Sequence, residues 1–213
     1  AYREFLDKLT QKTYIKITTL HRAFWEMKDE LDIEKFLNMN TVNKIKKGFI
    51  MILGVSSCLL GNMCRYDGHG AKDDFVFNSL KDYFTLLPYC PENSIWSAPR
   101  EAIRQVSIDG EVKIFTSTKE PKDVTDILDD ACEKMALKAC NDDLCGFVLK
   151  SASPTCGMER VKVYQPLNAP SIKNGVGVFA KKLKEKMPNL PIEEEGRLND
   201  AWLRENFLMQ VYS

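Results

Sequence analysis

The stretch FIMILGVSSC, residues 49–58, decides the fold class. Its first eight residues, Phe49–Ser56, form a mainly apolar run of the length of one strand. Such a run is typical of a parallel strand that is buried on both faces. Parallel strands require crossover connections, which are usually helices. The stretch therefore predicts an α/β domain.

The chain that follows alternates between helical and extended patterns. The clearest helix is Lys122–Ala139, whose apolar residues recur on one face. Further helices are predicted over Phe75–Tyr83, Gly177–Met187 and Leu198–Val211, and further strands over Phe84–Tyr89, Glu111–Thr116, Cys145–Lys150 and Leu190–Ile192. We expect residues 49–213 to form a Rossmann-like domain with a largely parallel sheet flanked by helices.

Residues 1–48 differ from this domain in composition. They contain one glycine, no proline and no cysteine, and apolar residues such as Leu20, Phe24 and Met27 recur at helical spacing. We interpret the segment as an N-terminal helical extension of unknown role.

Composition excludes several classes of function. The 213 residues carry 30 basic and 30 acidic side chains, and this balance argues against broad binding to nucleic acid or to anionic membranes. The longest apolar stretch, Phe49–Val55, is far shorter than the roughly 20 residues that a membrane-spanning helix needs. We therefore expect no membrane segment.

Cysteine is the most informative residue type. The seven cysteines are Cys58, Cys64, Cys90, Cys132, Cys140, Cys145 and Cys156. An odd number, without a secretory signal, indicates reduced thiols and a cytoplasmic protein. The absence of a Cys-x-x-Cys pair argues against zinc ribbons and thioredoxin-type centres, and two histidines are too few for a His-rich metal site.

Three cysteines come directly after predicted strands. Cys58 follows the first strand, Cys90 follows Phe84–Tyr89, and Cys156 follows Cys145–Lys150. Ligands of open α/β sheets bind at the carboxyl ends of the strands, so we expect these three thiols near one crevice. Three thiolates suit an iron–sulfur cluster in which one iron has no protein ligand and can act as a Lewis acid. The alternative is that the three are small residues filling buried loops.

Cys64 is less certain, because it lies only six residues after Cys58 and so could also be near the site. The other three cysteines are interpreted as structural.

Two polar residues accompany the three thiols. Glu92 lies two residues after Cys90, and Ser153 lies three before Cys156. The carboxylate is a candidate general acid or base, and the hydroxyl a candidate hydrogen-bond donor. The structural alternatives are a salt bridge between Glu92 and Arg100 and a turn cap at Ser153.

A competing signal is GVGVFA, residues 175–180. It fits the dinucleotide-binding pattern G-x-G-x-x-A, and Glu194 and Glu195 follow about 20 residues later. The preceding residues, 165–174, are not an apolar strand, so these glycines are better explained as a helix cap.

The order of motifs resembles that of a known bacterial family. The motifs are GVSSCLLG (54–61), RYDG (65–68), CPE (90–92), PRE (99–101), KSASPTCGMERVKVY (150–164), GVGVFAKKLKE (175–185) and LPIEEEGRLNDAWLRENF (190–207). Over residues 51–212 the chain resembles the domain-of-unknown-function family typified by thiouracil desulfurase, and its longer members in particular. In those members a second, helical domain follows, which the resemblance implies for a full-length protein.

The resemblance implies a [4Fe–4S] cluster on Cys58, Cys90 and Cys156, with Glu92 and Ser153 assisting catalysis. The implied reaction removes sulfur, as sulfide, from a thiolated nucleobase or a similar small thiocarbonyl compound, without net redox change. Two alternatives stay open: a non-catalytic cluster-binding module that senses redox state or carries sulfur, and a thiol-containing nucleotide-binding domain without a cluster. Release of sulfide from 2-thiouracil would distinguish the enzyme from both.

Overall fold

The computed structural model describes residues 51–165 and 169–212. The helical extension expected over residues 1–48 lies outside the described residues. The described part is an α/β fold in which helices flank a parallel sheet. This agrees with the fold class expected from the sequence.

The central sheet contains four parallel strands. Their spatial order is β2 (Thr85–Tyr89), β1 (Ile52–Ser56), β5 (Leu144–Leu149) and β8 (Ile192–Glu194). The apolar run that predicted β1 is buried as expected, since Leu53 and Val55 are fully inaccessible to solvent. Gly54 faces the opposite side of the sheet, where an added Cβ would lie 2.3 Å from the Phe147 ring. A glycine is therefore needed at this position for β1 and β5 to pack closely.

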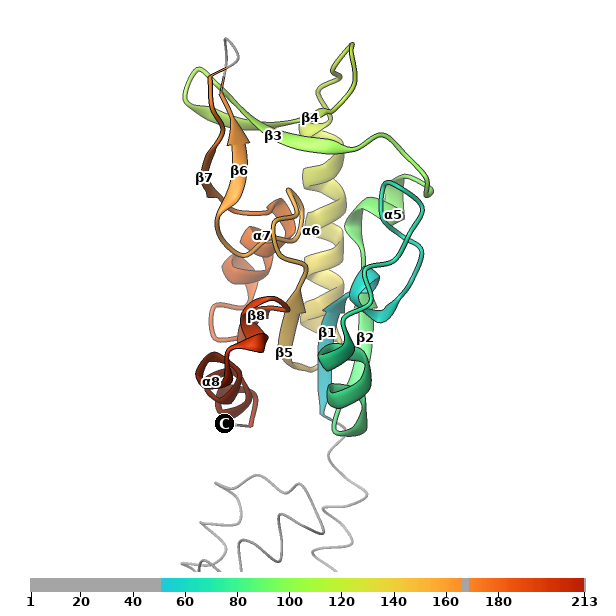
Figure 1. The fold of residues 1–213 in the computed structure, drawn as a ribbon, viewed down its shortest axis with the longest axis vertical. Coiled ribbons are helices and arrows are strands. Elements are labelled where there is room, and N and C mark those ends of the chain that lie inside the picture. The colour runs from blue at the N-terminus through green and yellow to red at the C-terminus, as the bar shows by residue number, and fades with distance from the viewer. Residues whose placement is uncertain (1–50, 166–168, 213) are drawn as a thin grey trace, which may run out of the picture.

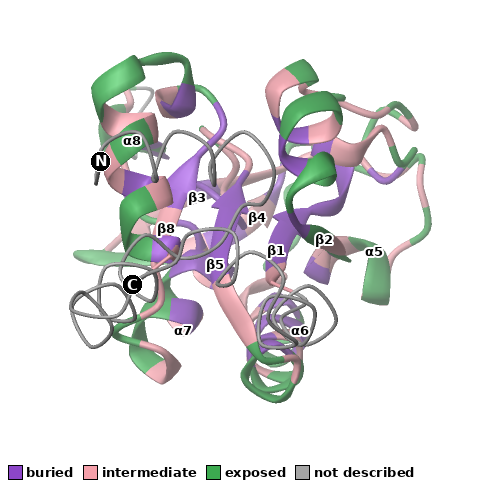
Figure 2. Cartoon of the chain, turned by 90° about the horizontal axis from the view of Figure 1, so that it is seen from below, coloured by how far each residue is buried: buried purple, intermediate pink, exposed green. Residues whose placement is uncertain are grey.

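Helices cover both faces of this sheet (Figure 2). One face carries α6 (Thr125–Asn141) and α7 (Val178–Lys186), and the other carries α8 (Ala201–Val211). Phe147 of β5 anchors the first side, where its ring lies 5.1 Å from that of Tyr89 and 5.6 Å from that of Phe179. Two separate hydrophobic cores result, one on each side of the sheet.

A second, mixed sheet lies beyond one end of the parallel sheet (Figure 1). Its order is β4 (Glu111–Thr116), β3 (Ile103–Ile108), β6 (Val161–Tyr164) and β7 (Ile172–Gly175). Only β4 was expected from the sequence, as a member of the first sheet. β3 and β4 form a hairpin whose turn residues, Asp109 and Gly110, have φ of 51° and 86°, as a two-residue turn between twisted strands requires.

The remaining elements agree with the sequence in place but differ in detail. The predicted helix 75–83 is a short π-helix, Phe75–Ser79, continued by a 3₁₀ turn, Leu80–Asp82. Residues Pro91–Ile95, expected as a loop, form the short helix α5. α8 begins after Asp200, whose carboxylate accepts the Leu203 N–H at 3.0 Å and caps the helix. None of the helices in the described ranges has the length and apolar character needed to cross a bilayer.

Candidate functional site

The candidate site is a cavity of about 340 Å³ at the carboxyl ends of the parallel strands. Cys58 lies in the 3₁₀ turn Ser57–Leu60, directly after β1. Cys90 follows β2 and begins α5, and Cys156 lies in the loop after β5. All three line the cavity, together with the other two residues selected from the sequence, Glu92 and Ser153. The structure thus brings the five predicted site residues together.

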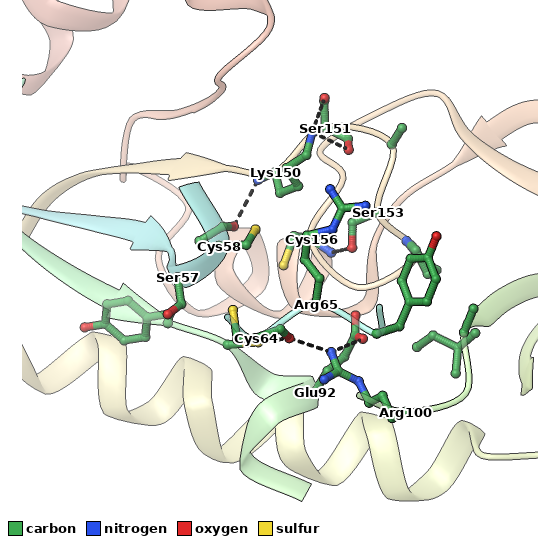
Figure 3. Close-up of a pocket in the computed structure, with 18 residues that line it drawn as sticks. Ser57, Cys58, Cys64, Arg65, Glu92, Arg100, Lys150, Ser151, Ser153 and Cys156 are labelled. Atoms are coloured by element: carbon green, nitrogen blue, oxygen red, sulfur yellow. Dashed lines mark hydrogen bonds and ion pairs between the residues drawn. The ribbon is translucent and has the colours of Figure 1, made fainter. Parts of the chain in front are cut away.

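A fourth thiol, that of Cys64, lines the same cavity (Figure 3). The Cys64 residue is 5% exposed, and the Cys90 thiol donates to the Cys64 carbonyl oxygen at 3.9 Å. Interaction between the neighbouring thiols lowers the pKa of Cys64 and, together with burial, raises the pKa of Cys58 and Cys90. These three thiols therefore form one interacting group.

The pKa of Cys156 is determined mainly by burial. Burial raises its pKa to about 12, against hydrogen bonds from Ser56 and Ser153 that favour the thiolate. The Ser153 oxygen also accepts the N–H groups of Thr155 at 3.2 Å and of Cys156 at 3.1 Å. Ser153 therefore fixes the turn that carries Cys156, as the structural interpretation of this serine expected.

Glu92 is held at both of its carboxylate oxygens. Oε1 accepts the Thr155 hydroxyl at 2.6 Å, and Oε2 accepts Arg100 Nη2 at 2.7 Å. The expected salt bridge with Arg100 is present, but it is buried, with the two side chains 8% and 16% exposed. A buried ion pair fixes the orientation of both groups, because a buried charge without its partner would destabilise the fold. Arg100 Nη2 also donates to the Cys64 carbonyl oxygen at 2.9 Å.

The loop that carries Cys156 is fastened to the end of β8 by adjacent acidic residues. Glu194 Oε1 accepts the Met158 N–H at 2.7 Å, and Glu195 Oε2 accepts the Ser151 N–H at 2.7 Å. The other oxygen of Glu195 pairs with Lys150, which lines the cavity. Sequence reasoning did not assign these roles, although three consecutive acids at the end of a short buried strand were a usable signal.

Gly177 agrees with the cap interpretation of GVGVFA. It is the N-cap of α7, and its N–H donates to the Gly157 carbonyl at 2.7 Å. A Cβ atom added at Gly177 would lie 2.5 Å from the Thr155 carbonyl oxygen. The glycine is thus needed where α7 packs against the Cys156 loop.

The cavity fits an iron–sulfur cluster by its donors and by its charge. Thiolates are the ligands of such clusters, and four thiols lie here in one enclosed space. Arg65, Arg100 and Lys150 line the same cavity, and among the described residues that line it only Glu92 has an acidic side chain. Positive charge offsets the repulsion between several thiolates. No three His, Cys, Asp or Glu side chains within 51–165 and 169–212 are arranged to hold a single metal ion; the cysteines of a cluster bind different irons and need not converge on one point.

Most of the chain matches a known protein family. A model of the 2-thiouracil desulfurase family matches residues 53–195. The chain belongs to this family. All five predicted site residues lie within the matched range, and the resemblance inferred from the motifs is confirmed.

Two individual proteins are also similar to this chain. The solved structure of TudS, a [4Fe–4S]-dependent thiouracil desulfidase, covers 73% of this chain and 98% of its own, with 25% identity and a TM-score of 0.55. The uncharacterized protein YbbK of Bacillus subtilis (strain 168) is 32% identical over 157 residues, which are 70% of this chain and 99% of YbbK.

A different similarity covers a short stretch only. Forty-nine residues, 23% of this chain, are 49% identical to the Res subunit of the type III restriction-modification enzyme EcoPI of Escherichia phage P1. The chain spans about 5% of the length of that subunit.

Proposed function

We propose that this protein is a [4Fe–4S]-dependent desulfurase that removes sulfur, as sulfide, from a thiolated nucleobase or a similar small thiocarbonyl compound. The observation that carries the proposal is the meeting of three strand-end thiols and Glu92 in one cavity, in a chain of the 2-thiouracil desulfurase family. The reaction exchanges C=S for C=O with water, so it transfers no electrons. It needs no electron-transfer partner.

Cys58, Cys90 and Cys156 are the residues that would hold the cluster. Each follows a different parallel strand, so the rigid sheet fixes the three thiols relative to one another. The chemistry that the cluster supplies when bound is Lewis acidity toward the thiocarbonyl sulfur, at the iron without a protein ligand. Lys150 lies near Cys58 and favours its thiolate.

Glu92 is the candidate general base. Because Thr155 and Arg100 hold both oxygens, the carboxylate keeps one orientation at the cavity wall. In the proposed reaction it takes a proton from the water that attacks the thiocarbonyl carbon. Ser153 assists by holding the Cys156 turn and by hydrogen bonding to the Cys156 thiol.

The decisive experiment is anaerobic reconstitution followed by assay of iron, acid-labile sulfide and sulfide release from 2-thiouracil. We expect about four irons and four sulfides per chain, with turnover. Alanine at Cys58, Cys90 or Cys156 should abolish iron binding, whereas Cys140→Ala, at an exposed cysteine, should leave it intact. A full cluster without turnover on a panel of thiolated bases would favour the non-catalytic module instead.

A further inference from the structure

We propose that Cys64 is an exchangeable fourth ligand of the cluster. In the absence of substrate its thiolate would hold the iron that Cys58, Cys90 and Cys156 leave without a protein ligand, and it would give way when a thiocarbonyl sulfur enters. The step replaces one sulfur donor by another, so no electrons are transferred. The inference rests on the proposed function, because it assumes that the cluster is bound in this cavity.

The first observation is the position of the Cys64 thiol. Cys64 is buried and lines the same cavity as the other three cysteines, and the Cys90 thiol donates to its carbonyl oxygen at 3.9 Å. Cys64 belongs to the hydrophobic core on the α8 side of the sheet, and its thiol points into the space where Figure 3 shows the sulfur atoms of Cys58 and Cys156.

The second observation is that Cys64 comes from a different kind of element. Cys58 and Cys90 lie directly after β1 and β2, and hydrogen bonds to Ser153, Glu194 and Glu195 hold the loop that carries Cys156 after β5. Cys64 lies in the loop between the 3₁₀ turn Ser57–Leu60 and the π-helix at Phe75. A thiol on a loop can move away without disturbing the sheet, as an exchangeable ligand must.

The third observation is a buried connection from Cys64 to Glu92. Arg100 Nη2 donates both to the Cys64 carbonyl at 2.9 Å and to Glu92 Oε2 at 2.7 Å. The other two nitrogens of this guanidinium, Nε and Nη1, are buried and have no hydrogen-bond partner among the described residues. Unpaired buried donors lower the stability of the fold, yet Arg100 stays in the position that connects the Cys64 loop to the candidate base. A substrate that moves Glu92 would therefore also shift Arg100 and, through it, the Cys64 loop.

The test compares reconstituted wild type with Cys64→Ala, Cys64→Ser and the matched control Cys140→Ala, all as the full chain. Mössbauer spectra of ⁵⁷Fe-loaded protein report the ligands of each iron, and a chelator measures how fast one iron is lost. We expect all variants to take up four irons. One iron should become spectroscopically distinct in Cys64→Ala and in Cys64→Ser but not in Cys140→Ala, and its loss from Cys64→Ala should be about tenfold faster than from wild type, which corresponds to about 1.4 kcal/mol.

Adding 2-thiouracil should make one iron spectroscopically distinct in wild type as well. The apparent Kd of 2-thiouracil should be about tenfold lower in Cys64→Ala than in wild type, because no thiolate competes for the iron. Identical spectra and rates in wild type and Cys64→Ala would overturn the proposal. So would loss of the cluster from both folded Cys64 variants, which would make Cys64 a permanent ligand; circular dichroism checks their folding. If wild type assembles the cluster but releases no sulfide, the proposed function fails, while the spectroscopic difference still decides the role of Cys64.

Discussion

Glu92 is partly buried, and its two carboxylate oxygens accept hydrogen bonds from unlike donors, a hydroxyl and a guanidinium. Glu92→Gln preserves the shape of the side chain but removes the negative charge and the proton acceptor. We expect reconstituted Glu92→Gln to retain its iron and to release sulfide from 2-thiouracil about 10²–10⁴-fold more slowly, as the loss of a general base does.

The matched control is Glu101→Gln, at an exposed glutamate nine residues further along the chain. It should release sulfide at the wild-type rate. A wild-type rate in Glu92→Gln, with normal iron content, would exclude Glu92 as the base.

Glu194 permits a prediction about pH and stability. Burial raises its pKa, so the folded state holds this proton to higher pH than the unfolded state does. Its contribution to stability therefore falls as pH rises from the unfolded value through the folded one. Glu194→Gln keeps an oxygen for the Met158 N–H but does not titrate. We expect urea unfolding to show wild-type stability near pH 4 and equal or greater stability near pH 8.

Glu194→Ala tests the hydrogen bond itself. It leaves the partly buried Met158 N–H without this acceptor, which costs about 1–3 kcal/mol in the free energy of unfolding at either pH. If Glu194→Gln were destabilised as much as Glu194→Ala at both pH values, the hydrogen bond to Met158 would not be the contribution of Glu194.

At the scale of elements, the β3–β4 hairpin depends on one glycine. Gly110 has φ of 86°, and an added Cβ would meet no atom within 4 Å. Gly110→Ala therefore introduces backbone strain without a steric clash, and we expect a loss of about 1–2 kcal/mol in the free energy of unfolding. Gly196 is the matched control, because its φ of −64° and ψ of −31° are open to any residue. Gly196→Ala should be neutral or more stable by up to about 1 kcal/mol in the same urea titration; equal losses in both variants would contradict the argument from φ.

The two sheets differ in how far the sequence predicts them. β1, β2 and β5 could be located because a parallel strand buried on both faces needs a local apolar run. β6 has only four residues, and β7, with the sequence IKNG, has no apolar pattern. The place of β6 depends on pairing with β3, about 60 residues earlier in the chain, and β7 in turn pairs with β6; no local pattern reports the pairing with β3. The local signals of this sheet were the extended pattern of Glu111–Thr116 and the Asp109–Gly110 pair that precedes it.

At the scale of the whole molecule, the site could be predicted where the sheet determines it. Cys58, Cys90 and Cys156 were selected because carboxyl ends of parallel strands meet at one edge. Cys64 and Arg100 could not be assigned in this way. Their positions depend on contacts distant in sequence, such as the hydrogen bond from Arg100 to the Cys64 carbonyl, 36 residues away. The predicted strands thus locate the three strand-end cysteines, whereas contacts between loops place Cys64 and Arg100 beside them.

The cavity joins segments that are otherwise separate, and this predicts how the fold responds to removal of the cluster. Loops after β1, β2 and β5 meet there, and burial opposes ionisation of the Cys156 thiol when it is unligated. A cofactor that binds only the folded state stabilises it, by about 2.7 kcal/mol at a hundredfold excess over its Kd. For a domain of this size, that corresponds to a Tm about 5–10 °C higher.

We therefore expect thermal unfolding of the reconstituted protein at a Tm about 5–10 °C above that of protein stripped by a chelator. The Cys140→Ala control should show the same difference, whereas Cys156→Ala should unfold at one temperature before and after reconstitution, because it holds no cluster. Equal Tm values for wild type with and without four bound irons would mean that the cluster does not bind the folded state in preference to the unfolded chain, and would contradict a site that the fold assembles.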